Sequence, residues 1–147
     1  MWVLIAWSVA VHSDLMAVGT ELCTIVLHRL STGKVLRVLA GPGVTPGCIG
    51  LQTEGVCFSV DRRQIIAAEF LNGRISWFTV EGAFLKNAGW LALSTDDKGI
   101  VLAPNGELIV ADKRSVHVFD SECNTIARTL STPGTAPGQL DAPQLFE

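Results

Sequence analysis

Short apolar runs separated by polar turns extend along most of this chain. In its middle part, four such runs follow one another at residues 56–60, 65–69, 75–80 and 83–85. The segments between them contain the residues that favour turns, such as Asp61-Arg62-Arg63-Gln64 and Glu81-Gly82. Runs of this length, rich in β-branched and aromatic residues and bounded by turns, are typical of β-strands. The pattern therefore predicts a four-stranded antiparallel unit.

The same series of runs recurs later in the chain. Residues 65–69 match residues 108–112 at an offset of 43, and residues 75–78 match residues 116–119 at an offset of 41. A weaker copy lies near the N-terminus, where the run 15–19 precedes its counterpart by 50 residues. A period of roughly 40–50 residues is typical of the blades of a β-propeller, each a four-stranded antiparallel sheet. We therefore predict an all-β fold, a partial β-propeller of about three such blades, open rather than closed.

The linkers between the copies also repeat. Residues 41–50 and 133–141 are both rich in proline and glycine, and both contain Pro-Gly, then one intervening residue, then Ile or Leu. We expect one repeat domain over residues 1–147, with blades at about 9–40, 55–90 and 99–131 and a linker toward a next blade at 132–147. Closed propellers typically have four to eight blades. We therefore expect a fragment of a larger protein, with further blades in the same chain or self-association covering the exposed blade faces.

Composition is consistent with a folded chain and gives no general affinity for polyanions. Hydrophobic residues make up 48% of the sequence and charged residues 17%, against about 25% charged in a typical domain. The formal charge of −3 gives no overall attraction to nucleic acid or to an anionic membrane. The N-terminal residues 1–11 are apolar but have no basic residues before them and are shorter than the roughly 20 residues that span a bilayer. We interpret them as strand and expect a cytoplasmic protein without a membrane partner.

The cysteines and histidines do not form a recognisable site in the sequence. Cys23, Cys48, Cys57 and Cys123 are scattered without a C-x-x-C pair, so we expect reduced thiols, no metal and no cofactor. The three histidines are His12, His28 and His117. Neither a nucleophile elbow nor a glycine-rich phosphate loop accompanies them. We therefore expect no catalytic residues.

Two motifs in the third copy and the linker after it carry a resemblance to a known family. Residues 109–112 read Ile-Val-Ala-Asp, residues 116–119 read Val-His-Val-Phe, and residues 138–143 read Gly-Gln-Leu-Asp-Ala-Pro. The chain resembles the NHL-repeat β-propeller family, which has this order of motifs. Residues 24–34 of the first copy look more like a degenerate WD-type third strand and turn. The resemblance implies a non-catalytic, scaffold-like module for protein binding.

The carboxylates that end the second run of each repeat are expected to be structural. Asp112 and Glu69 occupy this position, and we expect them to accept hydrogen bonds from backbone amides of the following loop. The small residues Ala67, Ala68 and Ala111 beside them are expected to let neighbouring sheets approach closely. Metal or substrate binding by these carboxylates is the alternative.

A possible binding surface follows from the propeller topology, in which the loops between second and third strands share one face. The candidate binding residues on these loops are Asn72, Arg74, Lys113 and Arg114. A protein partner is our first expectation, because no aromatic residue except Phe70 accompanies the basic residues as single-stranded RNA binding requires. RNA binding remains an alternative. So does a propeller enzyme of the lactonase or lyase kind, although the innermost-strand positions Val56, Phe58 and Ile100 are apolar. Substrate recognition in a ubiquitin ligase would require a RING or B-box region outside these residues.

Overall fold

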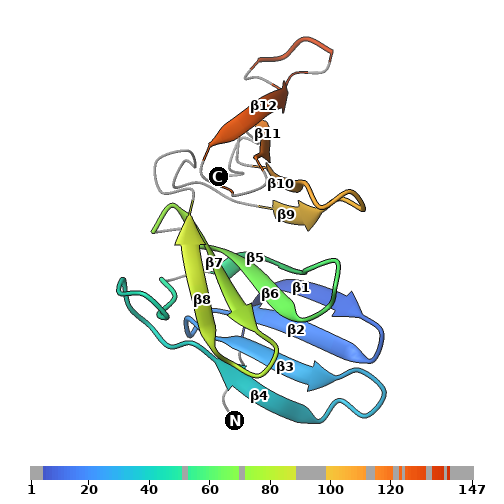
Figure 1. Ribbon diagram of the computed structural model, residues 1–147, viewed down its shortest axis with the longest axis vertical. Coiled ribbons are helices and arrows are strands. Elements are labelled where there is room, and N and C mark those ends of the chain that lie inside the picture. The colour runs from blue at the N-terminus through green and yellow to red at the C-terminus, as the bar shows by residue number, and fades with distance from the viewer. Residues whose placement is uncertain are drawn as a thin grey trace, which may run out of the picture.

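The computed structural model describes residues 5–50, 53–69, 72–88, 99–111, 115–120, 123, 125–131, 134–137 and 139. Within these residues the chain forms three four-stranded antiparallel sheets, each built from strands consecutive in sequence (Figure 1). The sheets do not close into a ring. The predicted all-β fold with three open four-stranded units is thereby confirmed. We call the sheets blade 1, blade 2 and blade 3 in chain order.

The strands of each blade run in the order of the sequence from one edge of the sheet to the other. Blade 1 consists of β1 (Ala6–His12), β2 (Leu15–Thr20), β3 (Ile25–Arg29) and β4 (Val35–Leu39). Blade 2 consists of β5 (Thr53–Phe58), β6 (Gln64–Glu69), β7 (Arg74–Thr79) and β8 (Phe84–Ala88). Blade 3 consists of β9 (Gly99–Leu102), β10 (Leu108–Ala111), β11 (Val116–Phe119) and β12 (Ile126–Ser131). Hence β1, β5 and β9 are the first-strand edges of their sheets.

Blade 2 is covered on both faces, which explains its unusually apolar strands. Alternate side chains of a strand point to opposite faces of a sheet. Val56, Ile65 and Ala67 pack into a cluster with residues of blade 1. Cys57 and Ile66, their neighbours in sequence, pack into a second cluster with residues of blade 3. Two hydrophobic layers thus join the three sheets face to face.

Blades 1 and 2 approach each other closely at the start of β5. The hydroxyl of Ser8 donates a hydrogen bond to the carbonyl of Thr53 at 2.9 Å. A Cβ atom added to Gly19 would lie only 2.6 Å from the same Thr53 oxygen, so this position accommodates only glycine. Ala67 and Ala68, which we expected at close approaches of this kind, are completely buried.

The tight turns repeat their backbone conformation from blade to blade. Between the first and second strands, a residue with positive φ stands in each blade: Ser13, Arg62 and Gly106. In blade 3 the turn is the Asn-Gly pair noted in the sequence, with Gly106 at φ 88° and its amide bonded to the carbonyl of Ala103. In blade 2 the same place is taken by Arg62 at φ 66°, where glycine would be less strained.

We predict that the same substitution made in strand β5 and in the turn that follows it will separate core from surface. Val56→Ala removes methyl groups from the layer between blades 1 and 2, where Val56 is 5% exposed, and should lower the free energy of unfolding by about 2 kcal/mol. Val60→Ala, at a side chain that is 59% exposed, should change it by less than about 0.5 kcal/mol. Urea denaturation followed by tryptophan fluorescence measures both. Equal effects would contradict the face-to-face packing.

Candidate functional site

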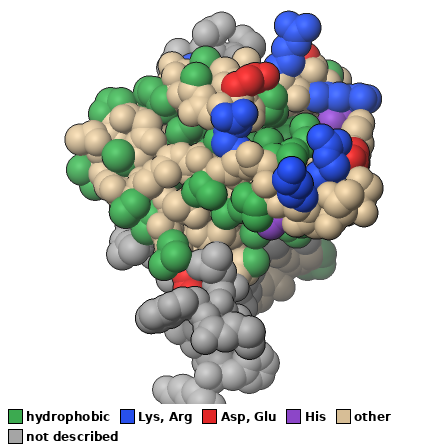
Figure 2. Space-filling model, turned by 90° about the horizontal axis from the view of Figure 1, so that it is seen from below, with side chains coloured by type: hydrophobic (Ala, Val, Ile, Leu, Met, Phe, Trp, Pro, Cys, Tyr) green, Lys and Arg blue, Asp and Glu red, His purple; other side chains and the backbone are tan. Residues whose placement is uncertain are grey.

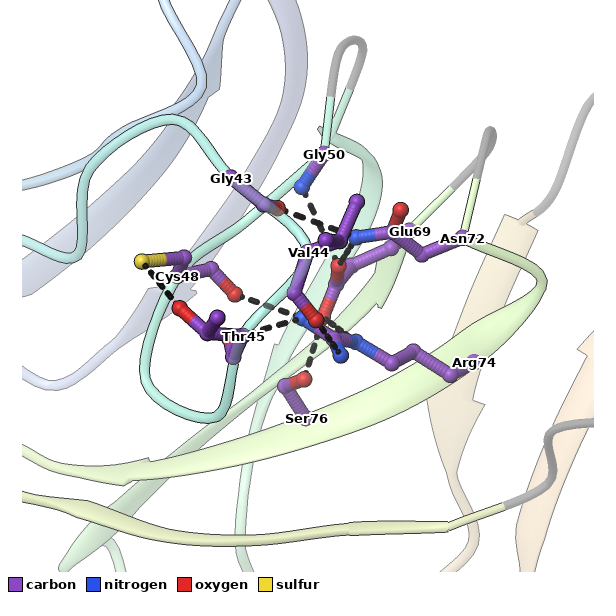
Figure 3. Close-up of polar contacts among 9 residues, drawn as sticks. All are labelled: Gly43, Val44, Thr45, Cys48, Gly50, Glu69, Asn72, Arg74 and Ser76. Atoms are coloured by element: carbon purple, nitrogen blue, oxygen red, sulfur yellow. Dashed lines mark hydrogen bonds and ion pairs between the residues drawn. The ribbon is translucent and has the colours of Figure 1, made fainter.

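A buried cluster of polar side chains lies where β6 ends and β7 begins. Glu69 and Arg74 stand opposite each other in the β6–β7 pairing, and both side chains are completely buried. The Nε atom of Arg74 donates to Oε1 of Glu69 at 2.9 Å. The hydroxyl of Ser76 donates a second hydrogen bond to the same oxygen (Figure 3). A buried charge is tolerated only when it is paired and its hydrogen-bonding capacity is used.

The linker between blades 1 and 2 supplies further partners of Arg74. Its guanidinium donates to the carbonyls of Val44 at 2.7 Å and Cys48 at 2.8 Å, and a longer contact of 3.4 Å reaches the carbonyl of Thr45. Figure 3 shows the linker turn curled around the end of this side chain. The guanidinium therefore binds the linker through its backbone, which requires no particular linker side chains.

Glu69 and Asn72 bind the linker on both sides of the residues that Arg74 contacts. Oε2 of Glu69 accepts the backbone amide of Gly50 at 3.1 Å and the Nδ2 group of Asn72 at 2.6 Å. The same Nδ2 group also contacts the carbonyl of Gly43 at 3.3 Å. A Cβ atom on Gly50 would lie 2.8 Å from Asn72 Nδ2, so a larger residue here would displace the Asn72 side chain from its present position. We call the set Glu69, Asn72, Arg74 and Ser76 the linker clamp.

The linker clamp corrects part of the binding surface expected from the sequence. Arg74 is completely buried, so the expectation that it lies exposed on a loop face is wrong. Asn72 is half-buried and turned toward the linker. Lys113 and Arg114 lie outside the described residues, as does Asp112. Arg74 is buried because the linker folds over this end of blade 2 and its carbonyl oxygens accept hydrogen bonds from the guanidinium. The segments in contact are 26–30 residues apart in the chain.

The structural role expected for Glu69 agrees with these contacts, although its backbone partner differs. The carboxylate was expected to accept an amide of the loop that follows it. It instead accepts the amide of Gly50 in the linker that precedes the blade. Its partner in the following loop is the side chain of Asn72 rather than the backbone.

A second feature is an apolar groove of about 470 Å³ along the innermost strands β1, β5 and β9. The expected inner-strand positions Val56, Phe58 and Ile100 line it. Its described lining includes no Asp, Glu, Lys or Arg side chain. His12 lies against Phe58, with ring centroids 6.1 Å apart, and its Nε2 atom is buried with no hydrogen-bond partner in the described part of the chain. The groove suits apolar contact rather than acid–base chemistry.

The other histidines and the thiols occupy separate places. His28 Nδ1 contacts the Gly33 carbonyl at 3.2 Å, and His117 Nδ1 contacts the Thr129 hydroxyl at 3.2 Å. All four cysteines are free thiols, and burial, together with the smaller effect of nearby Cys123, raises the pKa of Cys57 to about 12. Among the described residues, no group of three or more His, Cys, Asp or Glu side chains is placed to hold a metal ion. The described residues also contain no helix long and apolar enough to cross a membrane.

The comparison with solved structures extends over most of the chain. Hydrazine synthase of Kuenenia stuttgartiensis matches with a TM-score of 0.67 and 14% identity, over 87% of this chain and 36% of that one. The structure of U3-55K matches with a TM-score of 0.69 and 15% identity, over 86% of this chain and 39% of that one. This chain is similar in structure to WD40-type β-propeller proteins.

The likeness is one of fold alone, because the sequences are so distant. No family model and no curated protein matches the chain in sequence. The aligned part also covers less than two fifths of either matched structure. Function must therefore be argued from the surfaces of this chain.

We predict that Arg74→Met will destabilise the protein by about 3–5 kcal/mol, since it leaves the buried Glu69 carboxylate without its counter-charge. The exposed Arg37→Met is the matched control and should cost less than about 0.5 kcal/mol. Urea denaturation measures both. Released from the guanidinium, Cys48 should also react faster with a thiol reagent in Arg74→Met. Unchanged stability together with unchanged labelling would contradict the linker clamp.

The raised pKa of Cys57 predicts a loss of stability in alkali. A thiol whose pKa is raised on folding favours the native state below its unfolded pKa, and this contribution is lost as pH rises toward the folded value. The free energy of unfolding should therefore fall between pH about 9 and about 12, by at most about 1.4 kcal/mol per pH unit. Denaturation of wild type and Cys57→Ala across this range measures the difference between them. A parallel decline in both proteins would show that another group is responsible.

Proposed function

We propose that this chain is a non-catalytic β-propeller module of the NHL-repeat type that binds other proteins. The motifs of the third copy support the repeat type. Residues 109–111 form most of β10 and residues 116–119 form β11, and the two strands pair with Ala111 opposite Val116. The proposal depends most on the outer face of blade 1, meaning the face turned away from blade 2.

The outer face of blade 1 is equivalent to a face that is buried within this molecule. Directly paired residues of neighbouring strands share one face of a sheet. One row across the outer face of blade 1 consists of Val9, Val18, Val26 and Val38. The equivalent row of blade 2, which faces blade 1, consists of Val56, Ala67, Ser76 and Asn87. Residues of blade 1 pack against this face of blade 2, whereas the row of blade 1 consists entirely of valine.

Both ends of this apolar row are open to solvent, whereas Val26 between them is only 9% exposed. Val9 is 60% exposed and Val38 57%, and Trp7 and Val11 on the same strand as Val9 are also exposed. Contiguous exposed apolar surface on a folded chain marks a site of protein association. Each of the two interfaces within the molecule joins two apolar sheet faces. We therefore infer that the outer face of blade 1 fits an apolar sheet face of another blade.

The composition of the apolar groove supports the non-catalytic part of the proposal. An enzyme site at this place would need titratable groups from several innermost strands. The described lining is mainly apolar in its side chains, and its titratable members are His12 and Cys57, with no Asp, Glu, Lys or Arg beside them.

We predict that Val9→Gln/Val38→Gln will abolish concentration-dependent self-association of the chain, which tests whether the outer face of blade 1 accepts a sheet. Glutamine keeps the charge unchanged and replaces the apolar row with polar groups. Val44→Gln, in the exposed linker, is the matched control and should associate like wild type. Size-exclusion chromatography with light scattering gives the mass, and binding of a hydrophobic dye reports the free face. A wild-type protein that stays monomeric and binds no dye would refute the proposal.

A further inference from the structure

Blades 1 and 2 carry a cluster of cations at the end opposite the linker clamp. Four turns lie at this end, between β1 and β2, β3 and β4, β5 and β6, and β7 and β8. The exposed cations in or beside these turns are Arg29, Lys34, Arg37, Arg62 and Arg63. Figure 2 shows Lys and Arg side chains gathered toward one side of the molecule next to apolar surface. We call these five residues and their turns the basic turn surface.

Hydrogen bonds between the turns make them one continuous surface. Arg62 of blade 2 donates through Nη1 to the hydroxyl of Ser13 in blade 1 at 3.1 Å. Within blade 1, the amide of Leu30 donates to the carbonyl of Asp14 at 2.9 Å. Within blade 2, the amide of Val80 donates to the carbonyl of Arg63 at 3.0 Å. The turns that carry the cations are therefore held together.

Two carboxylates on this surface, Asp14 and Asp61, accept hydrogen bonds from residues of these turns. Asp14 accepts the amide and hydroxyl of Ser31 and pairs with Arg29 at 3.1 Å, and these bonds lower its pKa. Asp61 accepts the hydroxyl of Ser59 and the amide of Arg63, which lower its pKa too.

The basic turn surface therefore has an excess of positive charge. Of its five cations, Lys34, Arg37, Arg62 and Arg63 form no ion pair with a carboxylate within the part of the chain that the structure describes, although Asp61 lies near Arg63. The third carboxylate of these turns, Glu81, leaves the surface with a net charge of +2, although the whole chain carries −3.

Exposed aliphatic side chains stand among the cations. Leu30 is 45% exposed, Val35 51% and Val60 59%, and all three lie in or directly beside the same turns. No exposed aromatic side chain accompanies them among the described residues. Protein surfaces that bind single-stranded nucleic acid combine cations with aromatic rings on which the bases stack. A surface that binds an acidic protein segment with interspersed apolar residues needs cations and aliphatic contacts instead.

We propose that the basic turn surface binds an acidic polypeptide segment containing aliphatic residues. This inference goes beyond the proposed function, because it concerns a different surface from the outer face of blade 1. The carboxylates of the segment would pair with Lys34, Arg62 and Arg63, and its aliphatic residues would contact Leu30 and Val60. Charge complementarity of this kind gives specificity and salt-dependent association.

The test uses fluorescence anisotropy with a short labelled peptide of alternating Glu and Leu. Wild type should bind it more tightly than an equivalent peptide of Glu and Ser, and more weakly as salt rises. Lys34→Gln/Arg62→Gly/Arg63→Gln should weaken binding by roughly tenfold or more. Glycine is chosen at position 62 because the positive φ of that residue suits it, so the fold is retained. Lys86→Gln, whose ammonium lies over the Trp77 ring on the face of blade 2 that packs against blade 3, is the control and should bind like wild type.

Two further arms decide the chemistry of the partner. Leu30→Ser/Val60→Ser should remove the preference for the Glu–Leu peptide over the Glu–Ser peptide. An oligouridylate of similar length should bind more weakly than the Glu–Leu peptide; tighter binding would overturn the proposal in favour of RNA. Unchanged peptide binding by the triple variant would also overturn it. Repeating the titration with Val9→Gln/Val38→Gln separates this surface from the outer face of blade 1, so the two proposals fail independently.

Discussion

The arrangement of this molecule depends on covering apolar sheet faces with other sheets. A strand of alternating pattern can leave one face in water, but the strands of blade 2 are apolar on both faces. Blade 2 is therefore stable only between two neighbours, and it supplies side chains to both hydrophobic clusters. The close approach at Gly19 and the buried alanines of β6 are consequences of this stacking, because the sheets meet without room for larger side chains. The same constraint leaves the outer face of blade 1 as a surface that another sheet would complete.

The linker clamp has a different role: it fixes the connection between two stacked sheets. A linker rich in glycine and proline has few side chains with which to hold itself in place. Its exposed carbonyl groups are bound instead by the guanidinium of Arg74, and its amide at Gly50 is bound by Glu69. The ion pair is buried at a desolvation cost that only a full set of partners can offset. This explains why the surrounding residues Asn72 and Ser76 also contribute hydrogen bonds to it.

Charge is distributed unevenly between the two ends of blades 1 and 2. At the linker end the basic side chain of Arg74 is neutralised and buried, whereas at the turn end several cations remain exposed beside aliphatic residues. A net charge for the whole chain conceals this difference. The turn end and the outer face of blade 1 offer different chemistry, one cationic with aliphatic contacts and the other almost entirely apolar. The two surfaces proposed for binding therefore differ in chemistry and share no residue that is named for either.

The sequence by itself determined the strands, their grouping into three four-stranded sheets and the Asn-Gly turn. These features depend on residues close together in the chain, where alternation and turn chemistry act locally. The sequence also placed apolar residues correctly on the innermost strands. It misplaced Arg74, because the exposure of an arginine after a strand depends on what folds over it. Only the tertiary structure brings the carbonyls of residues 44–48 to that guanidinium, and only the contacts between turns of successive blades gather Lys34 and Arg63 on one surface. These contacts join segments that are far apart in the chain, so the local pattern of the sequence does not predict them.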